Sequence, residues 1–174
     1  MHVALLQASD AAQYRGLMLE AYDFAADAFA STAEERKTEP EAFWVKRIAD
    51  PTGMSAAVGA FKDQDLVGTV ALEFSAKPKT KHKALGIGMY VSPSARGTGA
   101  GRALLAAAVE YARAKPGVLQ LILTVTEGNE PALSLYRGAG FRAFGLEPMA
   151  ILTPSGYKGK VHMWLSLQHN ASAV

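Results

Sequence analysis

The stretch from Gly86 to Leu105 constrains the fold most, because it reads as a strand, a glycine-rich loop and a helix in direct succession. Apolar side chains alternate from Leu85 to Val91, with the period of two that marks a strand. Glycines 97, 99 and 101 follow, and their lack of side chains leaves the N–H groups at the helix start accessible. A helix start attracts anions, so the loop suits a phosphate or pyrophosphate, although glycines here also fit a plain tight turn. The helix is indicated by apolar residues that share one face: Leu104, Ala108, Tyr111 and Ala112.

Two familiar nucleotide-binding motifs do not fit this loop. A P-loop requires Lys followed by Ser or Thr after its last glycine, and the chain has Arg102 followed by alanine there. A dinucleotide-binding fingerprint that starts at the first of these glycines requires a glycine at position 102. The pattern that does fit is Arg96-x-x-Gly99-x-Gly101, preceded by a strand that ends in Val-x-Pro.

In this pattern the chain resembles the acetyl-coenzyme A (acetyl-CoA) loop of the GNAT family of N-acetyltransferases. A second segment, from Asn129 to Phe141, is similar to the N-x-x-A-x-x-x-Y-x-x-x-G-F segment of that family and follows in the family's order. The order of the expected strands and helices also resembles that of the family. The resemblance therefore extends over nearly the whole chain, whereas the motifs themselves cover only about a quarter of it.

The resemblance implies an α/β (α+β) fold with a mixed, mostly antiparallel central sheet. We expect about six to seven strands, splayed at one parallel pair and flanked by about four helices. The parallel pair would be the strand that ends at Val91 and the strand Leu119–Thr126, since a helix connects them. The second of these is strongly apolar, so we expect both of its faces to be covered. Residues 1–168 are expected to form one domain, and residues 169–174 a disordered tail.

Two further strands come from a predicted hairpin. Met54–Lys62 and Leu66–Ser75 flank a polar turn and have strand-like composition. Val161–Leu167 also alternates and is expected to close the sheet. In the second hairpin strand, the residues predicted to share one face are Leu66, Val70, Leu72 and Phe74.

The segment before the hairpin is less clearly marked. Thr38 and Glu41 match a capping box, which predicts a helix from there to about Ala49. Residues 22–37 have no clean period and fit either a loop or a short helix, the kind of segment that often contributes to specificity. We therefore assign three of its aromatic residues to the acceptor pocket: Tyr22, Phe24 and Phe29.

The resemblance implies that acetyl-CoA is the co-substrate and assigns roles to residues of both motifs. The amides from Gly97 to Arg102 would bind the pyrophosphate, and the backbone from Met89 to Val91 would pair with the pantetheine arm as strand addition. Asn129 would assist the arm, and Tyr136 would lie near the thioester sulfur. The residues expected to bind acetyl-CoA are Met89, Tyr90, Val91, Arg96, Gly97, Thr98, Gly99, Ala100, Gly101, Arg102, Asn129 and Tyr136.

The implied reaction is attack of an amine on the thioester carbonyl. The leaving thiolate needs a proton, so Tyr136 is the expected general acid, with a plain core tyrosine as the alternative. The backbone amide near Met89 or Tyr90 is the candidate for polarising the carbonyl.

The base that deprotonates the amine is less clear. An alkylammonium with a pKa of about 10.4 is mostly charged at pH 7, so a base or a desolvated site must remove a proton. Many relatives place a glutamate on the strand before the loop, but this chain has no carboxylate there. Glu73, on the neighbouring strand, is the candidate, acting through water. Glu20 and Glu127 are weaker alternatives, and an amine that is already neutral would need no base.

Composition narrows the class of protein. The 174 residues include no cysteine, and the four histidines show no ligand spacing, so we expect no metal. The apolar runs are too short for a membrane span and the N-terminus lacks signal-peptide features, which predicts a cytoplasmic protein without a membrane partner. The net charge is only +2 and the basic tract Lys77–Lys83 lacks aromatic residues, which argues against a nucleic-acid partner.

The charge is unevenly distributed along the chain. Residues 1–50 contain five basic and nine acidic residues, whereas the remainder contains thirteen and seven. This imbalance suits a cationic amine and a polyphosphate cofactor, although solvated faces produce similar imbalances. We expect the acceptor to be an amine of a small molecule, peptide or protein, and a homodimer is compatible with the resemblance. The alternatives are a non-catalytic acyl-CoA sensor and, less favoured, a nucleic-acid-binding domain.

Overall fold

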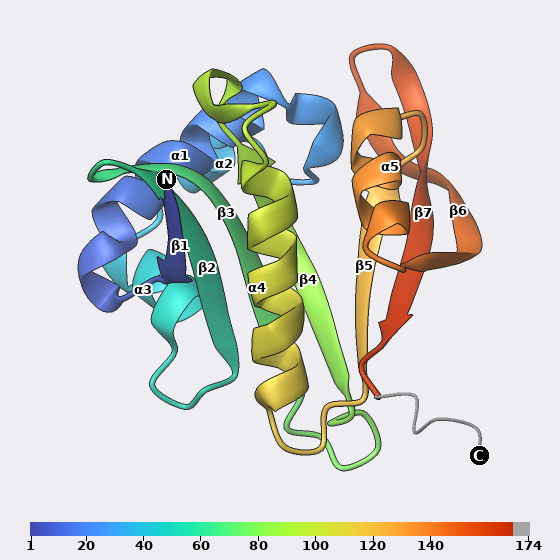
Figure 1. Cartoon of the computed structure of the whole chain (residues 1–174). Helices are drawn as coiled ribbons and strands as arrows, with labels where there is room; N and C mark the ends of the chain where they lie inside the picture. The colour runs from blue at the N-terminus through green and yellow to red at the C-terminus, as the bar shows by residue number, and fades with distance from the viewer. Residues whose placement is uncertain (169–174) are drawn as a thin grey trace.

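The computed structural model describes residues 1–168, so the expected tail at 169–174 lies outside the described residues. Seven strands form one sheet in the order β1-β2-β3-β4-β5-β7-β6 (Figure 1). The strands are β1 (His2–Leu5), β2 (Ser55–Lys62), β3 (Asp65–Phe74), β4 (Lys83–Val91), β5 (Gln120–Thr126), β6 (Arg142–Thr153) and β7 (Gly156–Ser166). The α-helices are α1 (Ala11–Phe24), α2 (Ala33–Arg36), α3 (Glu41–Ala49), α4 (Ala100–Ala114) and α5 (Glu130–Gly138).

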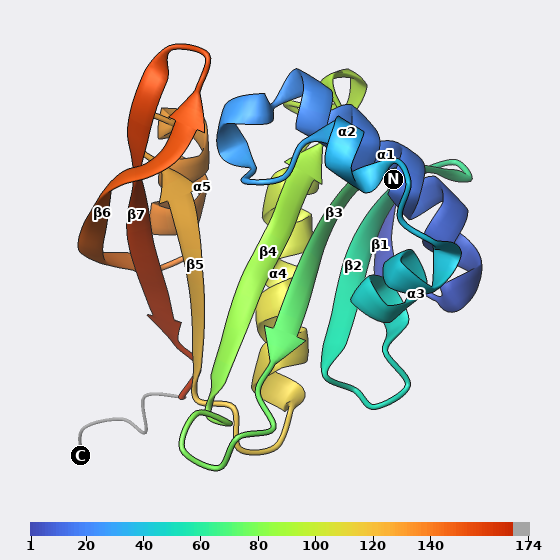
Figure 2. The ribbon, with the colours of Figure 1, turned by 180° about the vertical axis from the view of Figure 1, so that it is seen from behind.

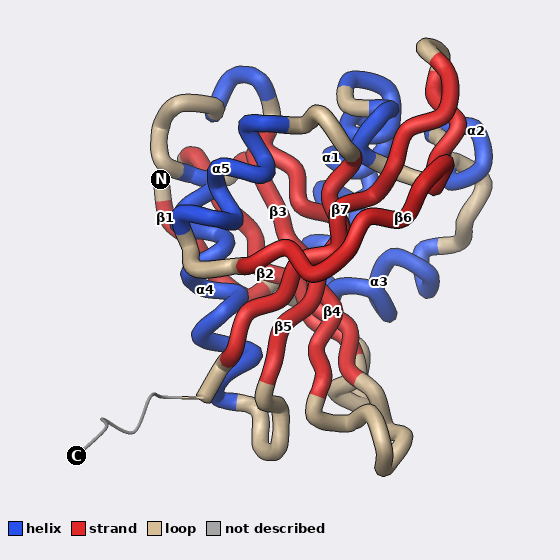
Figure 3. The backbone as a smooth tube through the Cα atoms, turned by 90° about the vertical axis from the view of Figure 1, so that its right-hand side faces the viewer, coloured by secondary structure: helices blue, strands red, loops and turns tan. Residues whose placement is uncertain are grey.

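The helices cover the two faces of the sheet separately. Figure 1 shows α4 and α5 in front of the sheet, and Figure 2 shows α1, α2 and α3 on the opposite face; Figure 3 gives the side view. The alternation of strand side chains divides the core accordingly. Val70 and Leu72 of β3 pack in the cluster that contains Leu104 of α4, whereas Ala71 packs in the cluster that contains Trp44 of α3.

The expected splay is present at the one parallel pair. β4 and β5 pair in parallel over only three positions, Lys83–Leu85 against Gln120–Ile122, and the ribbons diverge beyond them (Figures 1 and 2). On its other edge β4 contains a bulge, because Tyr90 pairs with Thr69 and Ile87 pairs with Ala71. The two intervening residues begin with Gly88, whose φ of 61° is readily adopted only by glycine. The short ladder leaves the upper half of β4 unpaired on the side that faces β5, and the bulge lies in the same half of the strand.

The predicted hairpin is confirmed as β2 and β3, but the Leu66 side chain lies on the opposite face of the sheet from the one predicted. Leu66 packs with Trp44 and Ala71 rather than with Val70 and Leu72. The ladder between β2 and β3 shifts register between Ala60 and Phe61, which reverses the alternation near the turn.

Two expectations about the C-terminal strands were wrong. The last strand, β7, lies between β5 and β6, so β6 rather than the Val161–Leu167 segment forms the sheet edge. β5 is buried on one face, at Leu121, Leu123 and Val125, but Thr124 on the other face is exposed. The reason is that α1 and α3 pack on β2 and β3 and do not extend over β5.

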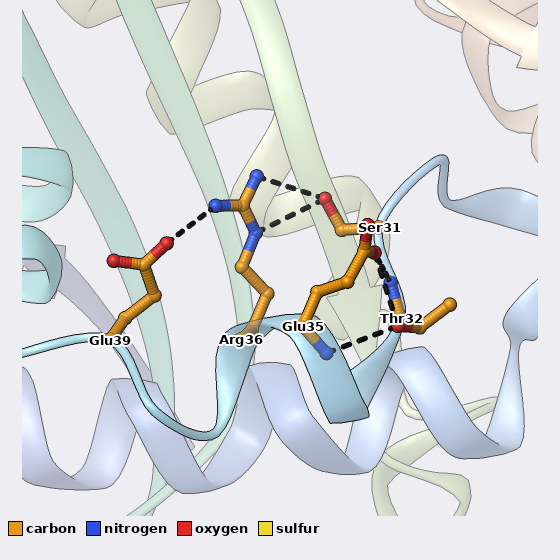
Figure 4. Close-up of polar contacts among 5 residues, drawn as sticks. All are labelled: Ser31, Thr32, Glu35, Arg36 and Glu39. Carbon is orange, nitrogen blue, oxygen red and sulfur yellow. Dashed lines mark hydrogen bonds and ion pairs between the residues drawn. The ribbon is translucent and has the colours of Figure 1, made fainter.

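Residues 1–168 contain five α-helices where about four were expected, because the segment 22–37 contains the short helix α2. Its capping box uses Thr32 and Glu35: each backbone N–H donates to the other residue's side-chain oxygen, at 2.7 and 3.2 Å (Figure 4). The predicted capping box of Thr38 and Glu41 is wrong. α3 begins at Glu41 with Pro40 as its N-cap, and it ends at Ala49 as predicted.

Candidate functional site

A cavity of about 300 Å³ opens where β4 and β5 diverge. Its walls come from the upper half of β4, from β5, and from helices on both faces of the sheet. The cavity therefore connects the α4–α5 side of the sheet with the α1–α3 side. The polar and aromatic residues and the methionine that line it from these elements include Tyr22, Phe29, Arg47, Met89, Asn129, Tyr136 and Lys160.

The glycine-rich loop forms the start of α4, as predicted. Gly97 and Gly99 have φ values of 76° and 88°, and a Cβ added at either position would meet nothing within 4 Å. Among the described residues, no protein acceptor takes a hydrogen bond from the N–H groups of Gly97 to Arg102. These free N–H groups at the positive end of a 15-residue helix are suited to an anion.

The side chains of the loop support its shape. Arg96 Nε donates to the Val91 carbonyl at 3.1 Å, and the Thr98 hydroxyl donates to the Ala95 carbonyl at 2.7 Å. The Arg102 side chain is exposed. Gly101 lies inward, where an added Cβ would be 3.6 Å from Met89 Cε, so the loop and the cavity-lining part of β4 are neighbours.

Tyr136 lies in the wall of the cavity on α5. It is 7% exposed, and its ring meets Phe141 edge to face with the centroids 5.6 Å apart. Burial raises the pKa of Tyr136 to about 12, so its hydroxyl holds its proton at neutral pH. A protonated hydroxyl in this position can donate a hydrogen bond or a proton to a group in the cavity.

Asn129 also lines the cavity, and it caps α5. Its Oδ1 accepts from the Ala132 N–H at 3.3 Å, as expected for an asparagine N-cap. Of the β4 residues assigned to the cofactor, Met89 lines the cavity, whereas the Tyr90 side chain is buried on the α1 side.

The structure does not bring the candidate carboxylates into the cavity wall. Glu73 is exposed near the start of the β3–β4 connection and lies outside the lining. The Glu20 carboxylate accepts hydrogen bonds from the Tyr90 and Ser92 hydroxyls, both at 2.9 Å, so it ties α1 to the end of β4. Glu127 also lies outside the lining and accepts from the Gly159 N–H at 3.4 Å.

Two of the three residues assigned to the acceptor pocket line the cavity, and the third does not. Tyr22 and Phe29 line the cavity, with their rings edge to face and 5.4 Å apart. Phe24 is 74% exposed and lies outside the lining, because α1 ends there with the ring on its solvent side.

Two basic residues of the cavity were missed by the sequence analysis. Arg47 reaches it from α3 and Lys160 from β7. The Lys160 ammonium donates to the Ala28 carbonyl at 3.2 Å, and burial lowers the pKa of this lysine. A signal for Arg47 was present, since it lies three residues after inward-facing Trp44 on the same helix face.

No group of three or more His, Asp or Glu side chains in residues 1–168 is placed to hold a metal ion. In the same range, no helix is long and apolar enough to cross a membrane.

These features describe an α/β protein with an anion-binding helix start beside a cavity that passes through a splayed sheet. The chain matches the acetyltransferase (GNAT) family over residues 18–141, and it belongs to that family. The resemblance inferred from the two motifs is thereby confirmed.

Two characterised relatives are similar to parts of the chain. It is 37% identical over 112 residues to streptothricin acetyltransferase of Streptomyces lavendulae, a match that covers 64% of this chain and 55% of that protein. It is 29% identical over 102 residues to the L-amino acid N-acetyltransferase AaaT of Escherichia coli, which covers 59% of this chain and 62% of that protein. The matches thus span less than two thirds of either relative.

Solved structures share the fold over nearly the whole chain. The phosphinothricin acetyltransferase of Sinorhizobium meliloti in complex with acetyl-CoA has a TM-score of 0.82 at 22% identity, covering 99% of this chain and 91% of that one. The acetyltransferase YncA of Salmonella typhimurium with its cofactor acetyl-CoA has a TM-score of 0.80 at 17% identity, covering 100% and 98%. The expected mixed sheet with one parallel pair is therefore confirmed as the fold of this family.

Proposed function

We propose that this protein is an N-acetyltransferase that moves an acetyl group from acetyl-CoA to a primary amine, by direct attack with both substrates bound. One observation supports this most: the free N–H groups of the α4 start adjoin a cavity that holds Tyr136 and crosses the sheet. A cofactor from the α4–α5 side and an acceptor from the α1–α3 side can meet there. Family membership and the relatives' activities are consistent with the proposal.

The residues fit acetyl-CoA at both of its ends. The pyrophosphate would bind the amides from Gly97 to Arg102, where added Cβ atoms at Gly97 and Gly99 would project into open space. The pantetheine arm would pair with the edge of β4 from Met89 to Val91, which has no ladder partner in the described structure on that side. Asn129 would assist the arm from the opposite wall.

The chemistry requires one bond to form and one to break. Bound acetyl-CoA supplies an acetyl group activated as a thioester. A C–N bond forms between the acceptor nitrogen and the acetyl carbonyl carbon, and the C–S bond breaks. The Met89 or Tyr90 amide would polarise the carbonyl oxygen, and Tyr136 would give its proton to the leaving sulfur.

The amine must lose a proton before or during its attack. No carboxylate lines the cavity within the described residues, so we propose that Glu73 accepts this proton through water. The positive charges of Arg47 and Lys160 also favour loss of this proton, because nearby cations lower the pKa of an ammonium group. An acceptor that enters this site therefore becomes neutral more readily than in water.

The proposed partner is a small-molecule or peptide amine. The relatives act, by their names, on streptothricin and on L-amino acids. A homodimer is also proposed, since β6 is a sheet edge that exposes Phe144, Leu146, Met149 and Leu152. Sedimentation should then give twice the chain mass of 18.4 kDa.

Calorimetric titration with acetyl-CoA, followed by an amine screen for released thiol, tests the function. Gly99→Asp and Gly99→Asn form a matched pair, because both residues tolerate a positive φ and cap helices, and only the former carries a charge. We expect the native protein to bind acetyl-CoA and Gly99→Asp to bind at least tenfold more weakly than Gly99→Asn. Equal binding by the two variants, or none by a folded native protein, would contradict the cofactor site. Binding without turnover of any amine would favour the non-catalytic sensor.

A further inference from the structure

Three buried donor groups lie together next to the acceptor side of the cavity. Within residues 1–168, the buried side-chain polar atoms without a hydrogen-bond partner are the Tyr14 hydroxyl, the Trp44 indole nitrogen and Arg47 Nε. The Tyr14 and Trp44 rings meet edge to face at 6.0 Å, and Arg47 follows Trp44 by one turn of α3. All three groups can donate a hydrogen bond, and leaving buried donors unsatisfied is unfavourable. Of the three residues, Arg47 lines the cavity, so a ligand that satisfies its guanidinium must bring acceptor atoms.

Arg47 makes this side of the cavity cationic. Its side chain lines the cavity, and its guanidinium lies 5.9 Å from the Phe43 ring centroid. None of the ion pairs among the described residues involves Arg47. The other charged residue of the lining, Lys160, is also basic. An unpaired, partly buried cation favours an anionic partner.

Tyr14 lies behind the cavity wall, near Arg47. The side chain is 0% exposed and outside the cavity lining, and its hydroxyl lies 3.7 Å from the position that a Cβ on Gly88, a lining residue, would take. Burial raises the pKa of Tyr14 to about 12, against the opposing charge of Arg47, so the guanidinium is near a hydroxyl that keeps its proton. Glu73 is the carboxylate whose charge acts on Tyr14 from β3.

We propose that the acceptor is an amine that also carries a carboxylate, and that Arg47 binds this carboxylate on the α1–α3 side of the cavity. This rests on the proposed acetyl transfer and names its substrate class. The planar fork of an arginine matches the two oxygens of a carboxylate. With the carboxylate held there, the amine extends toward Met89, where the acetyl group would lie. Of the charged side chains in residues 1–50, the one that lines the cavity is Arg47, so the acidic balance of this region does not extend to the cavity wall.

The test compares acceptors that differ only in the carboxylate. L-amino acids and their carboxamides are assayed in pairs, with released thiol as the readout and acetyl-CoA saturating. We expect the native protein to prefer the acids by about tenfold or more in kcat/KM. In Arg47→Gln the KM for the acids should rise about 10- to 100-fold, the range for a lost charge-assisted hydrogen bond. The amides lose only the effect of the Arg47 charge on the amine, so their KM should change far less. The proposal would be overturned if the native protein had the same kcat/KM for the amides as for the acids. It would also be overturned if Arg47→Gln raised the KM equally for both classes of acceptor.

Arg36→Gln is the matched control. Arg36 also lies over Phe43, at 5.0 Å, but its guanidinium already donates to Ser31 and to Glu39, as Figure 4 shows. Its loss should leave the preference for acids intact. Melting curves check the fold, and Arg47→Gln should melt no lower than the native protein, since it removes an unpaired charge.

A failure of the proposed function looks different. If acetyl-CoA is not bound and no amine releases thiol, the acetyl transfer itself is wrong. If acetyl-CoA is bound but no acceptor of the panel is acetylated, the carboxylate site is tested by amino-acid binding alone. With coenzyme A present, amino acids must then raise the melting temperature of the native protein and not that of Arg47→Gln. No such difference would overturn the carboxylate site while leaving the cofactor site standing.

Discussion

Tyr136 lies where a proton donor is needed, and its burial determines how it can act. Because burial raises the pKa of Tyr136 to about 12, the hydroxyl stays protonated far above neutral pH. An acid must be protonated to act, so activity that depends on it should be lost only as the pH rises toward 12. The basic side of the pH profile of kcat should therefore be flat up to about pH 10.

Tyr136→Phe tests this role with little change in packing, because the ring can still meet Phe141. We expect kcat to fall about 100-fold or more, the usual contribution of a general acid, while the dissociation constant for acetyl-CoA changes little. Stopped assays of thiol release and calorimetry measure the two quantities separately. An unchanged kcat would identify Tyr136 as a plain core residue.

For single residues of the site, the sequence predicts the position well where motif spacing alone defines it. The glycines at 97 and 99 and the tyrosine at 136 follow fixed patterns, and the structure places them at the helix start and in the cavity wall. Arg47 and Lys160 belong to no pattern, and they meet in the cavity only through the packing of α3 and the pairing of β7. Charge counts along the chain could not predict that cluster, since it depends on tertiary contacts.

The short 3-10 segment η2 (Ala26–Ala28) joins the two sides of the splay beside the cavity. Its Asp27 carboxylate pairs with Lys158 of β7 at 2.8 Å, and the Asp27 carbonyl accepts from the Thr126 hydroxyl of β5 at 2.7 Å. The Ala28 carbonyl accepts from Lys160. The segment holding Phe29 is thus tied to strands from the far end of the sequence.

Thr126→Val should loosen this connection without changing the shape of the side chain. Losing the buried hydrogen bond should destabilise the fold by about 1 kcal/mol, or roughly 2 to 4 °C in melting temperature. We also expect a several-fold rise in the acceptor KM with no change for acetyl-CoA, because Phe29 lies on the acceptor side.

Thr69→Val is the matched control, since its hydroxyl is also buried and bonded, to the Val58 carbonyl, within the β2–β3 pair. It should melt lower by a similar amount and leave the acceptor KM unchanged. If both variants raise the acceptor KM equally, the effect is one of general stability and η2 has no part in acceptor binding.

Elements with strong local sequence signals were predicted well. Features for which two local patterns compete, or which depend on long-range strand pairing, were not. The β2–β3 hairpin and α4 follow from alternation and helical period. Thr38 and Glu41 match a capping box, but Thr32 and Glu35 nearby form the actual one, and a sequence pattern does not rank the two. The place of β7 between β5 and β6 reflects long-range pairing that no local signal specifies.

The whole molecule has two parts that meet at the splay, where the strand ladder is short. The N-terminal strands have packing on both faces of the sheet, whereas β5, β6 and β7 join them through a three-residue ladder and through the cluster around α4 and α5. In the described structure, the edge of β4 that faces β5 has no strand partner after Leu85. A ligand that pairs with this edge should therefore stabilise the fold as a whole.

Acetyl-CoA at 100 times its dissociation constant should stabilise the folded state by about 2.7 kcal/mol, which is roughly 5 to 11 °C in melting temperature for a chain of this size. If the pantetheine arm pairs with β4, amide hydrogen exchange should slow in Met89–Val91. Adenosine diphosphate, which reaches the loop amides but has no arm, should protect the start of α4 only. Slower exchange confined to the loop with both ligands would place the arm outside the splay, and the cavity would then have to receive the acetyl group by another route.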